Sequence, residues 1–226
     1  MIWCVEDDSS IRDIEVYALC STGMDARGFE DGLSFWDALQ HEQPELVVLD
    51  VMLPGCDGVT LLKRMKESDQ FCHIPVIMAT AKGTEYDVIQ SLDLGADDYL
   101  TKPFGIMEMV SRVKAVLRRC RQHSDNRHLT VQGLLLDPEG HTVSVDGQRL
   151  TLTNKEYQLL YLFMSQPGVA FTRKQLLQSV WNTDYLGESR TVDMHIRTLR
   201  QKLGAYGSMI ETVRNVGYRM EIRHDK

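Results

Sequence analysis

The chain has 226 residues, of which 43% are hydrophobic and 25% charged, and its formal net charge is −7. This length allows one or two domains, and the composition is that of an ordinary globular protein, which excludes a disordered chain and a repeat array. No run approaches the roughly 18 apolar residues that a membrane span needs, and the start, MIWCVEDD, does not resemble a signal peptide. We therefore expect a cytoplasmic protein with no membrane partner.

The charge is unevenly distributed along the chain. Residues 1–122 carry 12 Lys and Arg against 21 Asp and Glu, whereas residues 125–226 carry 13 against 11. An acidic half and a mildly basic half predict separate partners. The five scattered cysteines form no C-x-x-C pair and no metal-ligand spacing, so we interpret them as reduced thiols.

Short apolar runs alternate with helical periodicity through the first half. Strand-like runs cover residues 2–5, 26–29, 46–49, 75–79 and a run that ends at residue 100. Helical spacing lies between them, at residues 11–19, 33–39, 59–65, 88–94 and 106–117. This alternation predicts an α/β fold with a doubly wound, five-stranded parallel sheet, because parallel neighbours need crossover helices and covered strands can be uniformly apolar.

Polar side chains stand where these strands end. They are Glu6 and Asp7 after the first strand, Asp50 after the third, Thr80 after the fourth and Lys102 after the fifth. In an open parallel sheet the carboxyl ends of the strands form one edge, where ligands bind. Clustered carboxylates need a neutralising cation, and Mg²⁺ prefers such oxygen ligands. A carboxylate beside Mg²⁺, a lysine and a hydroxyl predicts phosphoryl transfer that leaves an aspartyl phosphate on Asp50.

Each of these residues taken singly has a simpler explanation. An aspartate after a strand usually caps a turn or a helix, Lys102 by itself is a solvated charge, and Thr80 by itself is a loop hydroxyl. Asp57 follows Pro54 and Gly55, and we interpret it as a turn or N-cap residue. Only the ordered set predicts a site.

A change of character near the middle of the chain predicts a domain boundary. Residues 118–128, RRCRQHSDNRH, have almost no apolar content and no periodicity. We therefore predict a first domain at residues 1–121, a linker at 122–127 and a second domain at 128–226.

The second half begins with short strand-like runs and continues with helices. The runs cover residues 129–131, 134–137, 141–145 and 148–152, with a hairpin signal at Asp146 and Gly147. Capping-box patterns at Thr153 and Thr172 predict two helices, and a third spans residues 191–203. Two further runs, 209–213 and 218–222, close the chain. Strands, three helices and a terminal hairpin describe a winged helix-turn-helix α+β domain.

The third predicted helix has an apolar stripe and a polar remainder. The stripe consists of Val192, Ile196, Leu199 and Leu203. The remainder, expected to face solvent, consists of Arg190, Thr191, Met194, His195, Arg197, Thr198 and Arg200. Such a face can enter the major groove of DNA, and the basic turn RNVGYR that follows suits a wing on phosphate or in the minor groove. An ordinary solvated helix face is the simpler alternative.

Four segments of the first half, VEDDSSIR, LVVLDVMLPGCDG, PVIMATA and GADDYLTKPF, resemble the successive motifs of receiver domains in two-component signalling. The resemblance covers about residues 1–121 and implies a flavodoxin-like fold in which Asp50 accepts a phosphoryl group from a sensor histidine kinase. Asp7, Asp50 and the main-chain carbonyl of Met52 would bind Mg²⁺, with Glu6 acting through water.

The same resemblance assigns roles to the ends of the fourth and fifth strands. Lys102 would pair with the phosphoryl group, and its peptide bond to Pro103 would be cis. Thr80 and Tyr99 match the switch pair of receivers, in which the hydroxyl moves toward the phosphate and the ring turns inward.

The second half resembles the winged-helix effector of the OmpR/PhoB type over about residues 128–223. The matching segments are LTLTNKEYQLLYLF, TRKQLLQSVW, RTVDMHIRTLRQKL and VRNVGYRM. The resemblance implies that the polar remainder of the third helix meets DNA and that Thr212 and Arg214 contact its backbone. Loop 182–188 matches the segment that touches RNA polymerase in some members of the family. His195 could instead be a packed surface histidine.

Receivers of this family dimerise on phosphorylation through the fourth helix, fifth strand and fifth helix. The matching charged residues are Asp97, Asp98, Glu108, Arg112 and Arg119. Val88 stands where a basic partner for Glu108 is expected, and solvated surface charges are the simpler alternative. A receiver homodimer would favour two effector domains on direct-repeat half-sites.

Three functions from different classes could use these residues. The expected one is a response regulator of transcription, whose only chemistry is phosphorylation and autodephosphorylation at Asp50, so not an enzyme. A Mg²⁺-dependent phosphatase would need a carboxylate two residues after the nucleophile, where Met52 stands. A regulator that binds DNA regardless of phosphorylation would have no use for the full set of site residues.

Overall fold

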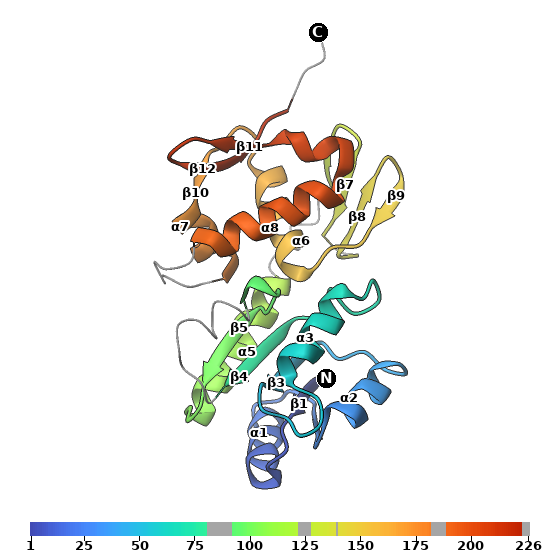
Figure 1. Ribbon diagram of the computed structural model, residues 1–226, viewed down its shortest axis with the longest axis vertical. Coiled ribbons are helices and arrows are strands. Elements are labelled where there is room, and N and C mark those ends of the chain that lie inside the picture. The colour runs from blue at the N-terminus through green and yellow to red at the C-terminus, as the bar shows by residue number, and fades with distance from the viewer. Residues whose placement is uncertain (81–91, 122–127, 139, 182–188, 223–226) are drawn as a thin grey trace. The chain divides into compact units, whose positions relative to one another are not determined.

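The structure, a computed structural model, describes residues 1–80, 92–121, 128–138, 140–181 and 189–222. It contains two compact units, Met1–Arg121 and Gln122–Lys226 (Figure 1). The linker expected at 122–127 and the loop at 182–188 lie outside the described residues, as do residues 88–91 of the helix expected at 88–94. No helix in the described part of the chain has both the length and the apolar character that crossing a membrane requires.

The first unit is built on a parallel sheet with the strand order β2-β1-β3-β4-β5. Its strands are β1 (Ile2–Val5), β2 (Ala26–Phe29), β3 (Leu46–Asp50), β4 (Val76–Thr80) and β5 (Asp98–Thr101). Every residue of β1, β3 and β4 is buried. This agrees with their uniformly apolar sequences, which predicted strands covered on both faces. The expected doubly wound fold is confirmed.

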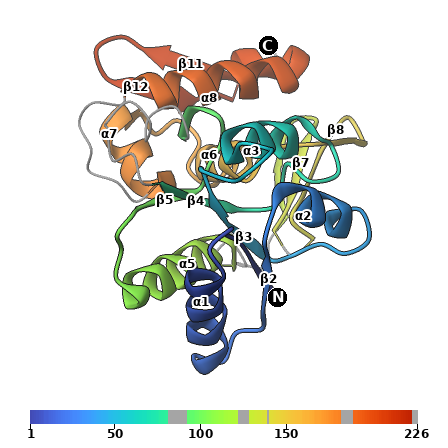
Figure 2. The same cartoon turned by 60° about the horizontal axis from the view of Figure 1, so that its bottom comes forward.

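Helices cover both faces of this sheet (Figure 2). They are α1 (Ser9–Ser21) and α5 (Ile106–Arg121) on one face, and α2 (Gly32–Leu39) and α3 (Gly58–Glu67) on the other. Aspartates begin three of them: the Asp8 side chain accepts from the main-chain NH groups of Ser10 and Ile11, Asp31 from those of Leu33 and Ser34, and Asp57 from that of Val59. The N-cap role expected for Asp57 is therefore confirmed.

The register of the strands brings the polar strand ends together. Val5 pairs with Leu49, so the residues that follow them, Glu6 and Asp50, are neighbours at one edge of the sheet. On the other side of β3 from β1, Thr80 at the end of β4 pairs with Thr101 at the end of β5. The carboxyl edge therefore collects side chains from four strands, because parallel strands all end there.

The second unit contains two antiparallel sheets and several helices. One sheet has the order β6-β7-β8-β9 and the other β10-β12-β11. The strands are β6 (Leu129–Val131), β7 (Leu134–Asp137), β8 (Thr142–Val145), β9 (Gln148–Leu150), β10 (Phe171–Thr172), β11 (Ile210–Val213) and β12 (Gly217–Met220). The helices are α6 (Asn154–Ser165), α7 (Arg173–Leu176), the π-helix η1 (Leu177–Trp181), α8 (Ser189–Lys202) and the 3₁₀ helix η2 (Gly204–Met209).

Local signals in this unit predicted turns and caps better than strand pairing. Asp146 and Gly147 have φ of 50° and 81° in the turn between β8 and β9, which suits the two-residue hairpin expected there. Both capping boxes form, at Thr153 and Thr172. The short strand β10 was not predicted, because two residues carry no periodicity and its pairing with β12 joins segments far apart in the sequence.

Candidate functional site

Three carboxylates meet at the carboxyl edge of the first unit. Glu6, Asp7 and Asp50 each offer an oxygen, and these oxygens lie within 4.8 Å of one another. Glu6 and Asp50 are buried, whereas Asp7 is exposed. Burial, together with the nearby charge of Asp50, raises the pKa of Glu6 despite its bond to Lys102. A group of hard oxygen donors at this range fits a small divalent cation.

Lys102 joins this cluster from the loop after β5. Its Nζ donates to Asp50 Oδ2 at 2.7 Å and to a Glu6 oxygen. Burial would lower the pKa of Lys102, but these two bonds and the two negative charges raise it, so the side chain stays an ammonium. The cis peptide bond expected between Lys102 and Pro103 is present.

The remaining residues expected at the first site are Met52, Thr80 and Tyr99. The main-chain NH of Met52 donates to Asp50 Oδ1 at 2.9 Å. Thr80 is 3% exposed and ends β4, the strand beside β3. Tyr99 lies half-buried in β5, opposite Met78, with the Arg112 guanidinium 5.8 Å from its ring centroid. The structure thus brings Glu6, Asp7, Asp50, Thr80 and Lys102 to one edge and places Tyr99 further back in β5, whereas the roles of all six stay predictions.

Glu15 is a buried carboxyl that sequence reasoning missed. It lies in α1, is 1% exposed, and its Oε1 is buried without a hydrogen-bond partner among the described residues. Burial first, and then the charges of Glu6 and Asp50, raise its pKa to about 7, although Lys102 acts in the opposite direction. The signal was available: position 15 follows Ile11 by four residues and precedes Leu19 by four, within one apolar stripe.

The raised pKa of Glu15 predicts a pH-dependent stability. Between its ordinary pKa of 4.5 and about 7 the folded chain holds a proton that the unfolded chain has lost, so the free energy of unfolding falls as pH rises through this window. We expect Glu15→Gln to remove this part of the fall, making the first unit more stable than wild type at pH 8 by up to about 3 kcal/mol.

Urea unfolding of the metal-free protein at pH 5 and pH 8 measures this difference. With Trp181 replaced by Phe, fluorescence reports the first unit alone, because Trp3 and Trp36 are the other tryptophans of the chain. Asp13→Asn, an exposed change on the same helix, should follow wild type. If Glu15→Gln is no more stable than wild type at pH 8, the Glu15 carboxylate is hydrated or has a hydrogen-bond partner.

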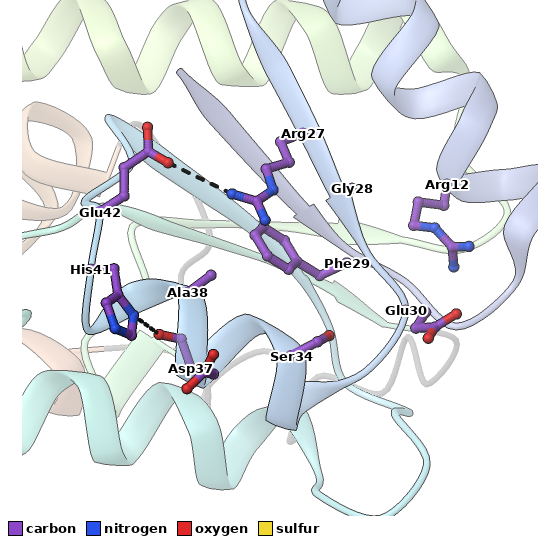
Figure 3. Close-up of a pocket in the computed structure, with 10 residues that line it drawn as sticks. All are labelled: Arg12, Arg27, Gly28, Phe29, Glu30, Ser34, Asp37, Ala38, His41 and Glu42. Atoms are coloured by element: carbon purple, nitrogen blue, oxygen red, sulfur yellow. Dashed lines mark hydrogen bonds and ion pairs between the residues drawn. The ribbon is translucent and has the colours of Figure 1, made fainter.

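A hollow of about 600 Å³ lies beside this cluster, between α1, β2 and α2 (Figure 3). Several side chains that line it interact with other parts of the chain. Arg27 pairs with Glu42 at 3.6 Å and lies over the Phe29 ring, and His41 Nδ1 lies 2.9 Å from a main-chain oxygen of α2. Arg12 links the hollow to the cluster, because its guanidinium donates to the main-chain oxygens of Glu6 and Asp7, at 2.7 and 3.3 Å.

The charges expected at a dimer interface are largely paired within the chain. Arg112 bonds to Asp98 at 3.1 Å and to Glu108 at 2.9 Å, and Arg119 lies 3.8 Å from Asp98. Asp97 is 0% exposed and accepts from Lys66 Nζ, so its assignment to a surface interface is wrong. The reason is that Asp97, directly before β5, has its side chain buried against Lys66, which sequence spacing does not reveal. Val88 lies outside the described residues.

Part of α8 presents the expected polar face. Arg190, Met194 and Arg197 are exposed, Met194 to 48%, and Thr198 is half-buried. At the tip of the β11–β12 hairpin, Arg214 is exposed, and Thr212 is exposed in β11. These six residues form a surface able to meet a polyanion.

Three residues expected on that face are buried or bonded to other parts of the unit. Thr191 is 0% and His195 6% exposed, so the expectation that they face solvent is wrong. The His195 ring lies 5.1 Å from that of Trp181 in η1, because the buried face of α8 is wider than its apolar stripe. Arg200 donates to the main-chain oxygen of Ile210 at 2.9 and 2.6 Å, which directs its guanidinium to the hairpin.

Comparisons with known proteins match both units. Residues 2–114 match the family model described as response regulator receiver domain, and residues 147–220 match transcriptional regulatory protein, C terminal. The chain is 43% identical over 223 residues to the phosphate regulon transcriptional regulatory protein PhoB of Pseudomonas aeruginosa, covering 98% of this chain and 97% of that protein.

Solved structures agree with this match. A mutant of RitR is similar with a TM-score of 0.75 and 27% identity, over 97% of this chain and 98% of that one. The response regulator DrrB, an OmpR/PhoB homolog of Thermotoga maritima, is similar with a TM-score of 0.50 and 29% identity, over 97% and 98%.

Proposed function

Because this chain belongs to the OmpR/PhoB family of response regulators, and is therefore a two-component regulator that controls transcription, we propose that Asp50 is its phosphoacceptor. The receiver domain implies a sensor histidine kinase as partner, and the C-terminal domain implies DNA binding. The observation that supports Asp50 is its placement among Glu6, Asp7 and Lys102 at the carboxyl edge of the sheet. An Asp50 oxygen would attack phosphorus, and a kinase histidine nitrogen would leave.

The metal we propose for this site is Mg²⁺. Asp7, Asp50 and the main-chain carbonyl of Met52 would hold it, with Glu6 acting through water. The bound ion would neutralise the charge that gathers on the phosphoryl oxygens. Lys102 already bonds to Asp50 and would pair with the phosphoryl group, while Thr80 and Tyr99 would act as the switch pair. The acidic cluster supports this proposal because its hard donors suit that cation.

This chemistry would serve regulation rather than turnover. We propose that the chain is no enzyme beyond phosphorylation and autodephosphorylation of Asp50. Met52, two residues after Asp50, has a thioether where a phosphatase of the aspartyl-phosphate type needs a general acid. Steady hydrolysis of phosphomonoesters would contradict this.

Phosphorylation would promote dimerisation of the receiver. Asp98, Glu108, Arg112 and Arg119 remain candidates, but an intermolecular pair would have to replace the internal ones. Such an exchange yields little net free energy at a surface, so the apolar parts of the interface would have to contribute most of the affinity. A homodimer would then place two effector domains on direct-repeat half-sites in the cytoplasm.

DNA contacts are proposed for the exposed residues of α8 and the hairpin. Arg190, Met194, Arg197 and Thr198 would enter the major groove, while Thr212 and Arg214 would reach the backbone beside it. RNA polymerase would be met by residues 182–188. Thr191 and His195 would support the helix instead, because they are buried.

DNA affinity measured with and without phosphoryl donor tests the whole proposal. A duplex selected from random sequences by the protein would be titrated in Mg²⁺, before and after treatment with acetyl phosphate. We expect affinity for two adjacent half-sites to rise at least about tenfold on treatment, and affinity for one half-site to change little. Equal affinities in both states would favour a regulator that binds DNA regardless of phosphorylation.

Removing one exposed arginine tests the DNA interface. Arg197→Ala should weaken binding of the selected duplex by about 1 to 3 kcal/mol, because an arginine in the major groove bonds to base edges or phosphate. Arg149→Ala changes the charge equally on β9, at an exposed position of the other sheet, and should leave affinity unchanged. Equal effects of the two variants would indicate general charge attraction and contradict the assignment of α8.

A further inference from the structure

Tyr218 in β12 lies at the centre of a polar network along one flank of α8. The residue is 5% exposed, and two guanidinium groups lie near its ring, that of Arg173 at 5.0 Å and that of Arg200 at 5.4 Å from the ring centroid. Its hydroxyl donates to Asp193 Oδ1 at 2.7 Å, and Arg173 Nε donates to the same oxygen at 2.7 Å. Strand β12 is therefore attached both to α7 and to the first half of α8.

Arg200 makes a second attachment, between the second half of α8 and β11. Besides its two bonds to the main-chain oxygen of Ile210, its Nη2 donates to Thr212 Oγ1 at 3.0 Å. Both strands of the hairpin are thus joined to α8 by directional bonds.

The positions of these attachments constrain the geometry. Asp193 and Arg200 are seven residues apart, so they lie on the same flank of α8, about 10 Å apart along its axis. Two directional attachments at that separation fix both the tilt and the slide of the helix against the hairpin. Apolar packing by itself is non-directional and would leave both variable.

We infer that Arg173, Asp193, Arg200 and Tyr218 set the spacing between Arg197 on α8 and Arg214 at the hairpin tip. They are positioning residues, which let one duplex be contacted at two places at once. The inference rests on the DNA interface proposed above. Two linked contacts reinforce each other only if the distance between them matches the distance between their binding positions on the duplex. Loss of the network would therefore remove the contact made by Arg214.

A substitution that removes no charge tests this. Tyr218→Phe deletes one hydroxyl, and we expect it to weaken binding of the selected duplex about five- to tenfold. It should also lower the slope of log affinity against log salt concentration by about 1, because Arg214 no longer neutralises its phosphate. Arg214→Ala should lower the slope equally, and adding Tyr218→Phe to it should change affinity by less than about twofold.

A matched control exists in the same unit. The Tyr206 hydroxyl donates to Asp146 Oδ1, also at 2.7 Å, at the turn between β8 and β9. Tyr206→Phe removes the same kind of bond and should change neither affinity nor salt slope. Arg173→Lys keeps the charge but loses the Nε donor, and it should give the same result as Tyr218→Phe. It replaces Tyr218→Phe in the test if that variant unfolds at a lower temperature than wild type.

The outcomes distinguish a failure of this inference from a failure of the proposed DNA interface. One outcome would overturn the inference: Arg214→Ala weakens DNA binding, but Tyr218→Phe and Arg173→Lys each reduce affinity by the same factor whether Arg214 is present or replaced, and the salt slope does not change. The network would then only stabilise the fold. If Arg214→Ala by itself changes nothing, the hairpin contact of the proposed function fails and the inference fails with it. Non-additive losses with a lowered slope support the inference.

Discussion

Replacing Asp50 by asparagine is expected to abolish stable phosphorylation of the protein. With acetyl phosphate and Mg²⁺, intact-mass spectrometry of wild type should show one added phosphoryl group. The variant should show none, because the amide is a poor nucleophile and carries no charge to hold a cation. The environment of Asp50 is the reason to expect one site: Lys102 lies 2.7 Å from its Oδ2, and Glu6 and Asp7 lie beside it.

A neighbouring aspartate provides the control. Asp57 lies in the same loop region but is exposed and caps α3, so Asp57→Asn, which keeps an oxygen acceptor, should be labelled like wild type. Labelling of Asp50→Asn to the wild-type extent would sink the assignment. Chelation of Mg²⁺ should suppress wild-type labelling, which tests the metal separately.

Replacing Lys66 by methionine is expected to destabilise the receiver by about 3 to 5 kcal/mol. Lys66 and Asp97 have side chains that are 5% and 1% exposed, with 3.4 Å between Nζ and Oδ2. The ammonium also donates to the main-chain oxygens of Cys72 and Ile74, at 3.3 and 2.7 Å. Methionine has a similar length but leaves the buried Asp97 carboxylate without its counter-charge.

The same helix provides the matched comparison. Lys63 pairs with Glu67 at 3.8 Å, but both side chains are mostly exposed, so Lys63→Met should cost less than about 0.5 kcal/mol. Adding Asp97→Asn to Lys66→Met should recover part of the loss, because the uncompensated charge is then gone. Urea unfolding of chains with Trp181 replaced by Phe measures all three. A cost below about 1 kcal/mol for Lys66→Met would show that Asp97 is not charged or not isolated.

The site of the receiver could be predicted because its residues sit at strand ends. Glu6, Asp50 and Thr80 each close a recognisable apolar run, and parallel strands can only bring such ends to one edge. The winged helix could be predicted from caps and turns, such as Thr153 and Asp146, whose signals are local.

Predictions failed where a side chain's surroundings come from distant segments. Asp97 looked like a surface charge, yet it pairs with Lys66 from α3. His195 looked solvent-facing, yet the ring of Trp181 covers it. Arg200 bonds to the main-chain oxygen of Ile210, which the sequence did not indicate, while its contact with DNA stays a prediction. In each case the partner is not a neighbour within the same helix or strand, so periodicity gives no signal for it.

The sequence by itself determined the order of strands and helices, the two-domain organisation and the residues gathered at the acidic edge. Those properties follow from hydrophobic period, capping and the rule that parallel strands share one direction. Only the tertiary structure decided which charges are buried, as with Glu15 and Asp97, and which arginines of α8 remain exposed. The reason is that the protonation state and bonding of a polar group depend on solvent exclusion and on partners that packing brings together across the chain.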